Sequence, residues 1–194
     1  TRGASAPLRM VLLSDFNGTY GSTVYPPELG AVIKRILMEW KPSLVISAGD
    51  LIAGQSTKLS DQNVKAMWAA FDRDVYSPLK TAGIPFAFSL GNHDASLARD
   101  RREAALYWKA KAPALSFQSK EFFPFRYSFV YSGVFFVMLD ASGPNISAEQ
   151  RLWLTGQLAS AAAKAATFRL VVGHLPLAGI SEGKNKAGEI IKDA

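Results

Sequence analysis

The pattern that most constrains the fold is an alternation of short apolar segments with segments of helical periodicity. Residues 9–13, 44–47 and 84–90 are apolar runs of the kind found in buried strands. Between them, residues 27–40 and 61–79 carry apolar side chains at helical spacing, on one face of each predicted helix. Strands that alternate with helices in this way predict an α/β sheet built with right-handed crossover connections.

The second half of the chain follows a different order. A helix is predicted over residues 99–112. Residues 125–131 and 134–139 are apolar and flank Ser132 and Gly133, which predicts an antiparallel hairpin. The sequence therefore predicts mixed strand directions, and not one wholly parallel sheet.

A helix and a strand are predicted to follow the hairpin. Ser147 and Gln150 have the spacing of a capping box, and the helix they begin extends to about residue 166. Residues 168–172 form a further apolar strand, and another helix is predicted to begin near Lys184.

Length and composition are those of one globular domain. The chain has 194 residues, of which 48% are hydrophobic and 20% are charged, enough to bury one sizeable core. No apolar run approaches the roughly 20 residues that span a bilayer. Cysteine is absent, which excludes disulfides and thiolate metal ligands. We therefore expect a single domain over residues 1–194.

The net charge of +6 favours anionic partners, among them phosphorylated substrates, anionic surfaces and nucleic acid. The longest basic cluster, Arg99, Arg101 and Arg102, has Asp100 and Glu103 within it. Such mixed charge is typical of the polar face of a helix, so the sequence carries no specific signal for nucleic-acid binding.

Four of the apolar runs end in a polar group that is able to bind a metal ion: Asp15, Asp50, Asn92 and His174. In open α/β sheets, ligands bind outside the carboxyl ends of the strands. Each residue also has a structural alternative, because Asp and Asn suit turns and a histidine can be satisfied at a buried strand end. Four such groups at four strand ends favour a common site.

The motifs around these residues follow one another in a fixed order: Asp15-Phe16-Asn17, Gly49-Asp50, Gly91-Asn92-His93-Asp94 and Gly173-His174-Leu175-Pro176. This order resembles the calcineurin-like metallophosphoesterases, whose motifs are Asp-x-His, Gly-Asp, Gly-Asn-His-Asp/Glu and a later lone His. The resemblance extends from about Arg9 to Leu177. It implies a four-layer αββα fold, with mixed β-sheets between flanking helices.

Two departures from the family pattern stand out. Asn17 occupies a position where the family usually has a histidine ligand. The family's last motif, Gly-His-x-His, is missing, since His93 and His174 are the only histidines. We expect that the chain is truncated before that motif, with the C-terminal strands of the fold missing. The alternative is a degenerate relative without catalytic activity.

The resemblance implies a site for two metal ions. Asp50 would be shared by both ions, Asp15 and Asn17 would bind the first, and Asn92 and His174 would bind the second. Two ions roughly 3.5–4 Å apart can hold a phosphate ester while a bridging hydroxide attacks the phosphorus. Oxygen ligands favour Mn²⁺, and Fe, Zn and Mg are the alternatives.

His93 would not bind metal in this scheme. It would face the substrate, stabilising charge on the phosphoryl group or protonating the leaving oxygen. Asp94 would hold the His93 ring in place, with a helix N-cap as its structural alternative. Asp140 also ends a strand, but a turn explains it equally well, so it is not among the predicted ligands.

These inferences predict a metal-dependent phosphoesterase that hydrolyses phosphomonoesters or phosphodiesters of small molecules or macromolecules. We expect weak activity from this chain alone, because each metal site lacks a ligand. The alternative is a catalytically impaired family member that serves as a binding or scaffold protein. The start at Thr1 and the run Ala4-Ser5-Ala6 favour export to the periplasm over a cytoplasmic location. The oligomeric state stays open.

Overall fold

The first half of the chain builds a parallel three-stranded sheet. In the computed structural model, which describes residues 8–143, 145–176, 182–184 and 190–192, this sheet has the order β1 (Met10–Leu13), β2 (Leu44–Ser47), β3 (Phe86–Phe88). Leu13 pairs with Ser47 and Ser47 with Phe88, so the three strands end side by side. The predicted α/β alternation is confirmed.

Both crossovers of this sheet are helical, but neither is one uniform helix. The first consists of α1 (Pro27–Arg35) and the π-helical segment η1 (Ile36–Trp40). The second consists of α2 (Asp61–Phe71), the π-helical segment η2 (Asp72–Tyr76) and α3 (Ser77–Thr81). Apolar periodicity predicted the extent of these helices, but it does not distinguish α-helical from π-helical hydrogen bonding.

The second sheet is mixed, with the order β4 (Ser116–Ser119), β5 (Tyr127–Tyr131), β6 (Val134–Met138), β7 (Phe168–Val172). The predicted β5–β6 hairpin is confirmed as antiparallel, whereas β7 runs parallel to β6. The turn between β5 and β6 has positive φ at both central residues, 47° at Ser132 and 77° at Gly133, as a tight two-residue turn requires.

The remaining helices of the layered domain are α4 (Asn92–Ala95), α5 (Ala98–Ala110), α6 (Ala148–Ala159) and α7 (Ala161–Ala165). The prediction of a single helix over residues 147–166 is therefore wrong at Ser160, where α6 ends and α7 begins. Ser160 has extended backbone, and its hydroxyl accepts a hydrogen bond from the backbone N–H of Ala163 at 3.2 Å. A local cap thus overrides the alanine-rich helical pattern.

The predicted capping box at the start of α6 is only half formed. The Ser147 hydroxyl accepts the N–H of Gln150 at 3.1 Å. The Gln150 amide does not reach back to Ser147. It accepts the N–H of Asp140 and donates to the carbonyl of Asp140, both at 2.9 Å. This side chain therefore fixes α6 to the loop after β6.

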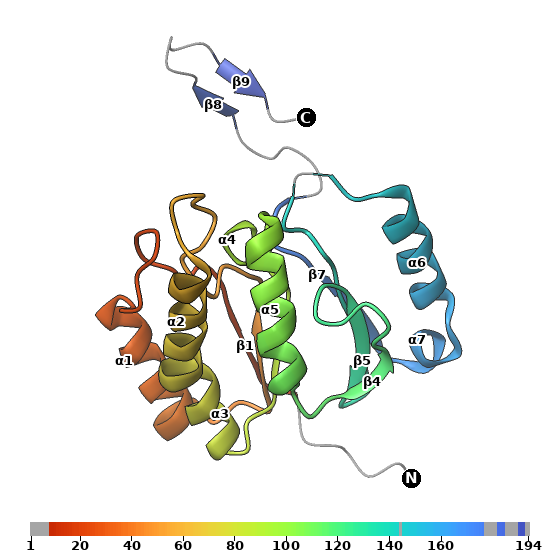
Figure 1. Ribbon diagram of the computed structural model, residues 1–194. Coiled ribbons are helices and arrows are strands. Elements are labelled where there is room, and N and C mark those ends of the chain that lie inside the picture. The colour runs from red at the N-terminus through yellow and green to blue at the C-terminus, as the bar shows by residue number, and fades with distance from the viewer. Residues whose placement is uncertain (1–7, 144, 177–181, 185–189, 193–194) are drawn as a thin grey trace.

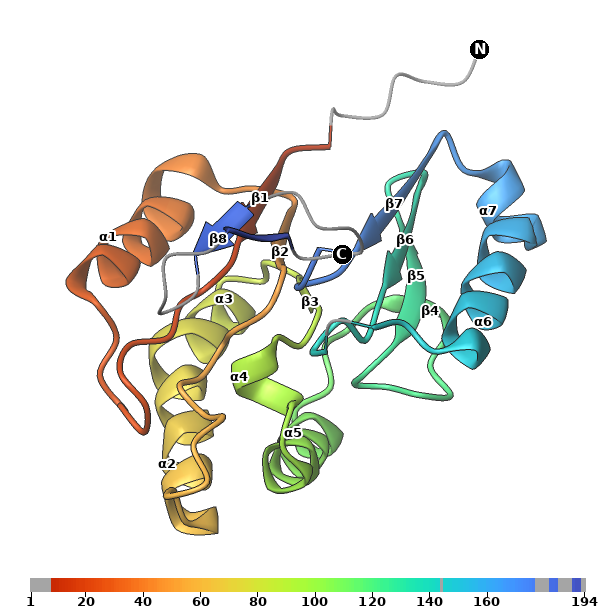
Figure 2. The same cartoon turned by 90° about the horizontal axis from the view of Figure 1, so that it is seen from above.

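The two sheets lie at the centre of the molecule with helices on both sides (Figures 1 and 2). Helices α1 and α2 lie outside the first sheet, and α6 and α7 lie outside the second. Strand β6 is buried on both faces: Phe136 and Met138 belong to the cluster between the sheets, and Phe135 and Val137 to the cluster under α6 and α7. The αββα layering implied by the sequence is thus confirmed.

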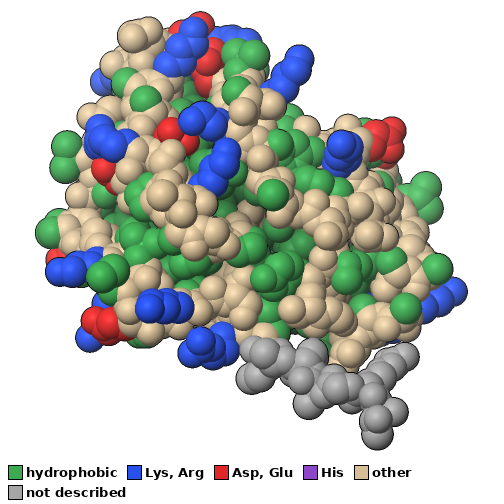
Figure 3. Space-filling model, turned by 90° about the horizontal axis from the view of Figure 1, so that it is seen from below, with side chains coloured by type: hydrophobic (Ala, Val, Ile, Leu, Met, Phe, Trp, Pro, Cys, Tyr) green, Lys and Arg blue, Asp and Glu red, His purple; other side chains and the backbone are tan. Residues whose placement is uncertain are grey.

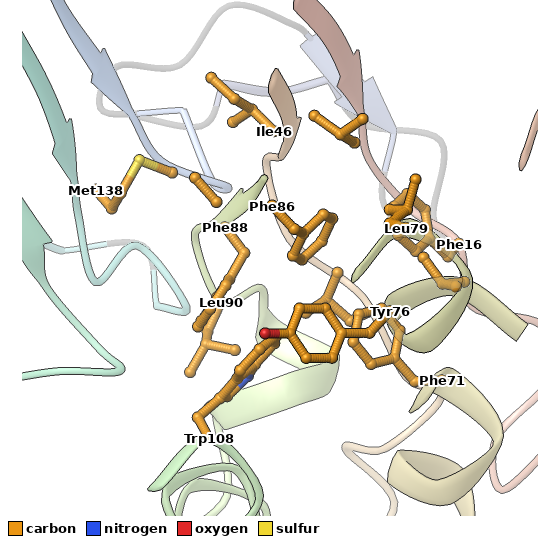
Figure 4. Close-up of a cluster of buried hydrophobic side chains, with 14 of the residues drawn as sticks. Phe16, Ile46, Phe71, Tyr76, Leu79, Phe86, Phe88, Leu90, Trp108 and Met138 are labelled. Carbon is orange, nitrogen blue, oxygen red and sulfur yellow. The ribbon is translucent and has the colours of Figure 1, made fainter. Parts of the chain in front are cut away.

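Aromatic rings fill the core between the first sheet and α5 (Figure 4). The rings of Phe88 and Trp108 stack with their centroids 3.8 Å apart, and both side chains are fully buried. Tyr127 joins the two sheets, because its hydroxyl accepts the N–H of Phe88 at 2.8 Å and donates to the carbonyl of Phe88 at 2.7 Å.

The helix predicted to begin near Lys184 is wrong for the described residues. β8 (Glu182–Lys184) and β9 (Ile190–Lys192) are strands, and they pair antiparallel. Residues 185–189 lie outside the described part of the chain. The β-branched residues Ile190 and Ile191 favour a strand over a helix. The polar residues around them gave no strand pattern in the sequence.

Several large apolar side chains are exposed on the end strands of the two sheets. Met10 and Leu12 lie on β1, and Phe168, Leu170 and Val171 lie on β7. On the face seen from below, hydrophobic side chains also reach the surface among scattered lysines and arginines (Figure 3). None of the helices in the described ranges is long and apolar enough to cross a membrane.

The hydrogen bonds of Tyr127 across the two sheets predict that removing its hydroxyl destabilises the protein. Tyr127→Phe leaves the buried N–H and carbonyl of Phe88 without their side-chain partner, so we expect the free energy of unfolding to fall by about 1–3 kcal/mol. Chemical denaturation measures this change. Tyr20→Phe is the matched control, since Tyr20 is 60% exposed, and should change stability by less than about 0.5 kcal/mol. Equal effects of the two substitutions would contradict the prediction.

Candidate metal centre

The candidate centre begins where β1 and β2 end. Backbone bonds continue between the two chain segments beyond the strands, from Asp15 N to Gly49 O and from Phe16 N to Asp50 O, both at 3.0 Å. Asp15 and Asp50 have positive φ, 57° and 55°. Such backbone strain at residues other than glycine persists where the surroundings impose it, often at functional sites.

Asp15, Asp50 and His174 converge. Each offers one ligand atom, and these atoms all lie within 4.8 Å of one another. Asn92 adjoins them, because its Oδ1 lies 2.9 Å from Nε2 of His174. The structure thus brings together four of the five residues predicted as ligands. Asn17 is half-buried on the loop after Asp15, and its role as a ligand stays a prediction.

Two glycines make this close approach possible. A Cβ on Gly91 would lie 2.1 Å from Oδ1 of Asp50, a distance no side chain tolerates. Gly49 has a φ of 120°, and a Cβ there would lie 2.8 Å from Nδ1 of His174. The glycines that precede Asp50 and Asn92 are therefore required sterically, and not only as turn residues.

The donor set of the cluster fits a cation. Nδ1 of His174 lies 3.0 Å from the carbonyl of Ala48 and so carries a proton, which leaves the Nε2 lone pair for the cluster. That nitrogen faces Oδ1 of Asn92 at 2.9 Å and Oδ1 of Asp50 at 3.4 Å. Lone pairs that face one another need a positive charge between them, which either a metal ion or a proton on Nε2 supplies.

The pKa of His174 reflects this environment. Burial lowers the pKa of the imidazole, but the hydrogen bond and charge of Asp50, with the charge of Asp15, outweigh burial, so the pKa is raised. The site thus attracts positive charge at Nε2. A bound divalent cation would take the place of that proton, which is how neutral histidine serves as a metal ligand.

His93 lies beside the cluster. Its backbone N–H donates to Oδ1 of Asp50 at 3.0 Å, and its Nε2 is 3.9 Å from Oδ2 of Asp50. The ring stacks on Tyr20, with centroids 5.2 Å apart and planes inclined by 20°. Nδ1 is buried, and no group of the described residues forms a hydrogen bond with it. The ring is therefore positioned by stacking, and Tyr20 is a site residue that sequence patterns did not indicate.

The predicted contact between Asp94 and the His93 ring is not formed. Asp94 is fully buried, and its two oxygens accept the N–H groups of Gly91 at 2.8 Å and Ile52 at 3.0 Å. Burial raises the pKa of Asp94, the hydrogen bond from the Gly91 N–H lowers it, and the charge of Asp50 raises it. Together these effects raise the pKa to about 7. Asp94 is also not the N-cap of α4, which is Gly91. It joins the loops that follow β2 and β3.

Gln55 orients the amide of Asn92. Its Oε1 accepts a hydrogen bond from Nδ2 of Asn92 at 3.0 Å, which directs Oδ1 of Asn92 toward His174. The backbone N–H of Gln55 in turn donates to Oδ2 of the buried Asp100 at 2.9 Å. A polar residue in a loop after Asp50 gave no sequence signal for this role, because the contact spans 37 residues.

Asp140 pairs with an arginine. Its Oδ2 accepts a hydrogen bond from Nη2 of Arg101 at 2.6 Å, and its Oδ1 accepts the Ser142 hydroxyl at 2.8 Å. These contacts explain its polar side chain without a metal ion.

The Gln55 contact predicts metal affinity. Gln55→Leu removes the acceptor that orients Asn92, so we expect Mn²⁺ to bind about 10-fold more weakly in isothermal titration calorimetry. Gln55→Glu keeps an acceptor at the same position and should retain the affinity. A loss of equal size in both variants would attribute the effect to the strained backbone at Gln55, whose φ is 72°.

The Asp94 contacts predict a structural effect. Asp94→Asn places an amide NH₂ opposite a backbone N–H, so the free energy of unfolding should fall by about 1–3 kcal/mol when measured with a chelator present. Asp61→Asn, at an exposed carboxylate of α2, should cost less than about 1 kcal/mol. If Asp94→Asn is as stable as the wild type, the carboxylate does not hold these loops.

Comparisons with known proteins show to which family this chain belongs. The family model for calcineurin-like phosphoesterases matches residues 8–192. Among solved structures, the chain is similar to the protein TT1561 of Thermus thermophilus, with 17% sequence identity and a TM-score of 0.33. That similarity covers 54% of this chain and 39% of the other. A search of curated proteins gave no match. On the family match over nearly its whole length, the chain belongs to the calcineurin-like phosphoesterases.

Proposed function

We propose that this protein is a metal-dependent phosphoesterase that hydrolyses phosphomonoesters or phosphodiesters. The observation that carries the proposal is the convergence of ligand atoms from Asp15, Asp50 and His174 within 4.8 Å at the ends of three strands. Family membership supports the same reaction class. The net charge of +6 suits an anionic phosphorylated substrate, whether a small molecule or a macromolecule.

The residues would divide between two ions. Asp15 and Asn17 would hold the first ion, Asn92 and His174 the second, and the Asp50 carboxylate would be shared. Divalent ions here would polarise the phosphoryl oxygens and activate the attacking water. Oxygen atoms outnumber nitrogen in this donor set, so we expect Mn²⁺ before Zn²⁺, Fe or Mg²⁺.

His93 is suited to act on the leaving group. Its Nδ1 is buried without an acceptor, so a proton there would be an unsatisfied buried donor. The neutral ring therefore carries its proton on Nε2, the nitrogen that lies on the Asp50 side of the ring. From that atom the ring can donate to a phosphoryl or leaving oxygen, and Tyr20 keeps the ring from turning away.

Hydrolysis of 4-nitrophenyl phosphate and of bis(4-nitrophenyl) phosphate tests this function. We expect weak turnover that requires added Mn²⁺ and stops with a chelator. Asp50→Asn should lower kcat/KM by about 100-fold or more, because it removes the shared ligand. Asp74→Asn, at a carboxylate of η2 that pairs with Arg73 and is not a predicted metal ligand, is the matched control and should leave turnover unchanged.

Two outcomes would contradict the proposal. Equal activity in the wild type and in Asp50→Asn would remove Asp50 from the centre. Tight Mn²⁺ binding without turnover of either ester would favour the binding or scaffold alternative.

A further inference from the structure

Two adjoining cavities lie away from the predicted metal ligands, and Arg101, Arg126 and Asp140 line both of them. The larger cavity, of about 390 Å³, has an apolar wall made of Phe122, Phe123 and Phe125. The smaller cavity, of about 210 Å³, is polar and is lined in addition by Ser142, Asn145, Ser147 and Gln150. Glu121 and Glu149 also line the larger cavity, so the two cavities together offer one ligand an apolar wall beside charged and polar groups.

Arg126 is the distinctive group in these walls. Only 8% of the residue is exposed, and its guanidinium lies 3.7 Å from the centre of the Phe122 ring. Nε is buried without a partner, and Nη2 donates to Glu149. Within the described residues, Nη1 makes no hydrogen bond. Among the described residues, the guanidinium thus has one hydrogen-bond partner, Glu149, for its five N–H donors.

The contact with Glu149 shows that Arg126 binds a carboxylate. The Glu149 side chain is 71% exposed, whereas the Arg126 side chain is 9% exposed. The Glu149 side chain can return to water without being transferred from a buried position, because most of it is already exposed. Arg126 cannot leave its position and needs a counter-charge there, because a buried charge without a partner is costly. An incoming oxyanion can therefore displace Glu149.

We propose that these cavities form a second oxyanion site, in which Arg126 binds a carboxylate or phosphate group carried on an apolar body. Both groups present two oxygens to the fork of guanidinium donors, and the phenylalanine wall would cover the apolar part of the ligand. Trp153, whose ring centre is 5.5 Å from the Arg126 guanidinium, has a buried indole N–H that also lacks a partner.

Two hydrogen bonds connect residues in or next to these walls with segments of the candidate metal centre. Arg101 donates to the carbonyl of Ala95, the last residue of the helix that carries His93, at 3.4 Å. The carbonyl of Ala141 accepts the N–H of Leu175, next to His174, at 3.1 Å. The ligand is accordingly a second acidic group of the phosphoester substrate, an assignment that rests on the proposed function.

Calorimetric titration with benzoate and with phenylphosphonate tests the site directly. All proteins carry Asp50→Asn and are titrated with Mn²⁺ present, so that the metal centre does not compete for the probes. We expect Arg126→Met to weaken binding about tenfold and Glu149→Gln to strengthen it. Arg35→Met, at a side chain that is 60% exposed on α1, is the matched control and should bind as the parent does. The stronger of the two probes identifies the oxyanion.

Thermal unfolding establishes that each variant is folded, and Arg126→Lys replaces Arg126→Met if the latter is not. Equal affinity in the folded Arg126 variant, weaker binding in Glu149→Gln, or no binding of either probe by the parent would overturn the proposal.

Kinetics with Asp50 intact then separate this site from the proposed function. We expect 4-carboxyphenyl phosphate to have a higher kcat/KM than phenyl phosphate, and Arg126→Met to abolish that preference. If neither ester is hydrolysed while benzoate still binds through Arg126, the proposed function fails and the oxyanion site stands. Hydrolysis of both esters with the same ratio in the wild type and in Arg126→Met would overturn the subsite alone.

Discussion

The contact on which the site depends is that between the Asp50 carboxylate and the backbone of Gly91. Oδ1 of Asp50 occupies the space that any side chain at position 91 would need. The same oxygen accepts the N–H of His93 and lies 3.4 Å from Nε2 of His174. One carboxylate therefore draws together the ends of β2 and β3 and the segment after β7, which belongs to the other sheet. A larger residue at position 91 would separate the groups that approach one another here.

Two buried carboxylates beside the centre, those of Asp94 and Asp100, hold backbone groups of the neighbouring loop. Asp94 and Asp100 are fully buried, and both accept N–H groups from the 51–55 segment. Their carboxyl oxygens accept loop N–H groups that no strand or helix bonds. The cost of burying them is reflected in the raised pKa of Asp94. These two carboxyl groups thereby fix the loop after Asp50, and Gln55 in that loop can hold the Asn92 amide in one orientation.

The sequence predicted what depends on local pattern. Strands at residues 44–47 and 168–172 were located without error, because apolar runs of that length between breakers allow few other structures. The ends of these two strands and of the two predicted at residues 9–13 and 84–90 led to the candidates Asp15, Asp50, Asn92 and His174, which the structure brings together. The break at Ser160 was not predicted, since a single cap competes there with a strong helical pattern. Contacts between distant segments were also beyond prediction: Asp94 bonds Ile52, and the ring of His93 stacks on Tyr20.

The loop after β6 shows why such contacts matter for function. Gln150 on α6 pairs with both backbone groups of Asp140, and Arg101 on α5 pairs with its carboxylate. The next residue, Ala141, is bonded to the segment that carries His174. Any movement of α6 therefore acts on two places at once, the walls around Arg126 and the position of His174. The walls around Arg126 and the segment that carries His174 are thus held by hydrogen bonds to the same loop.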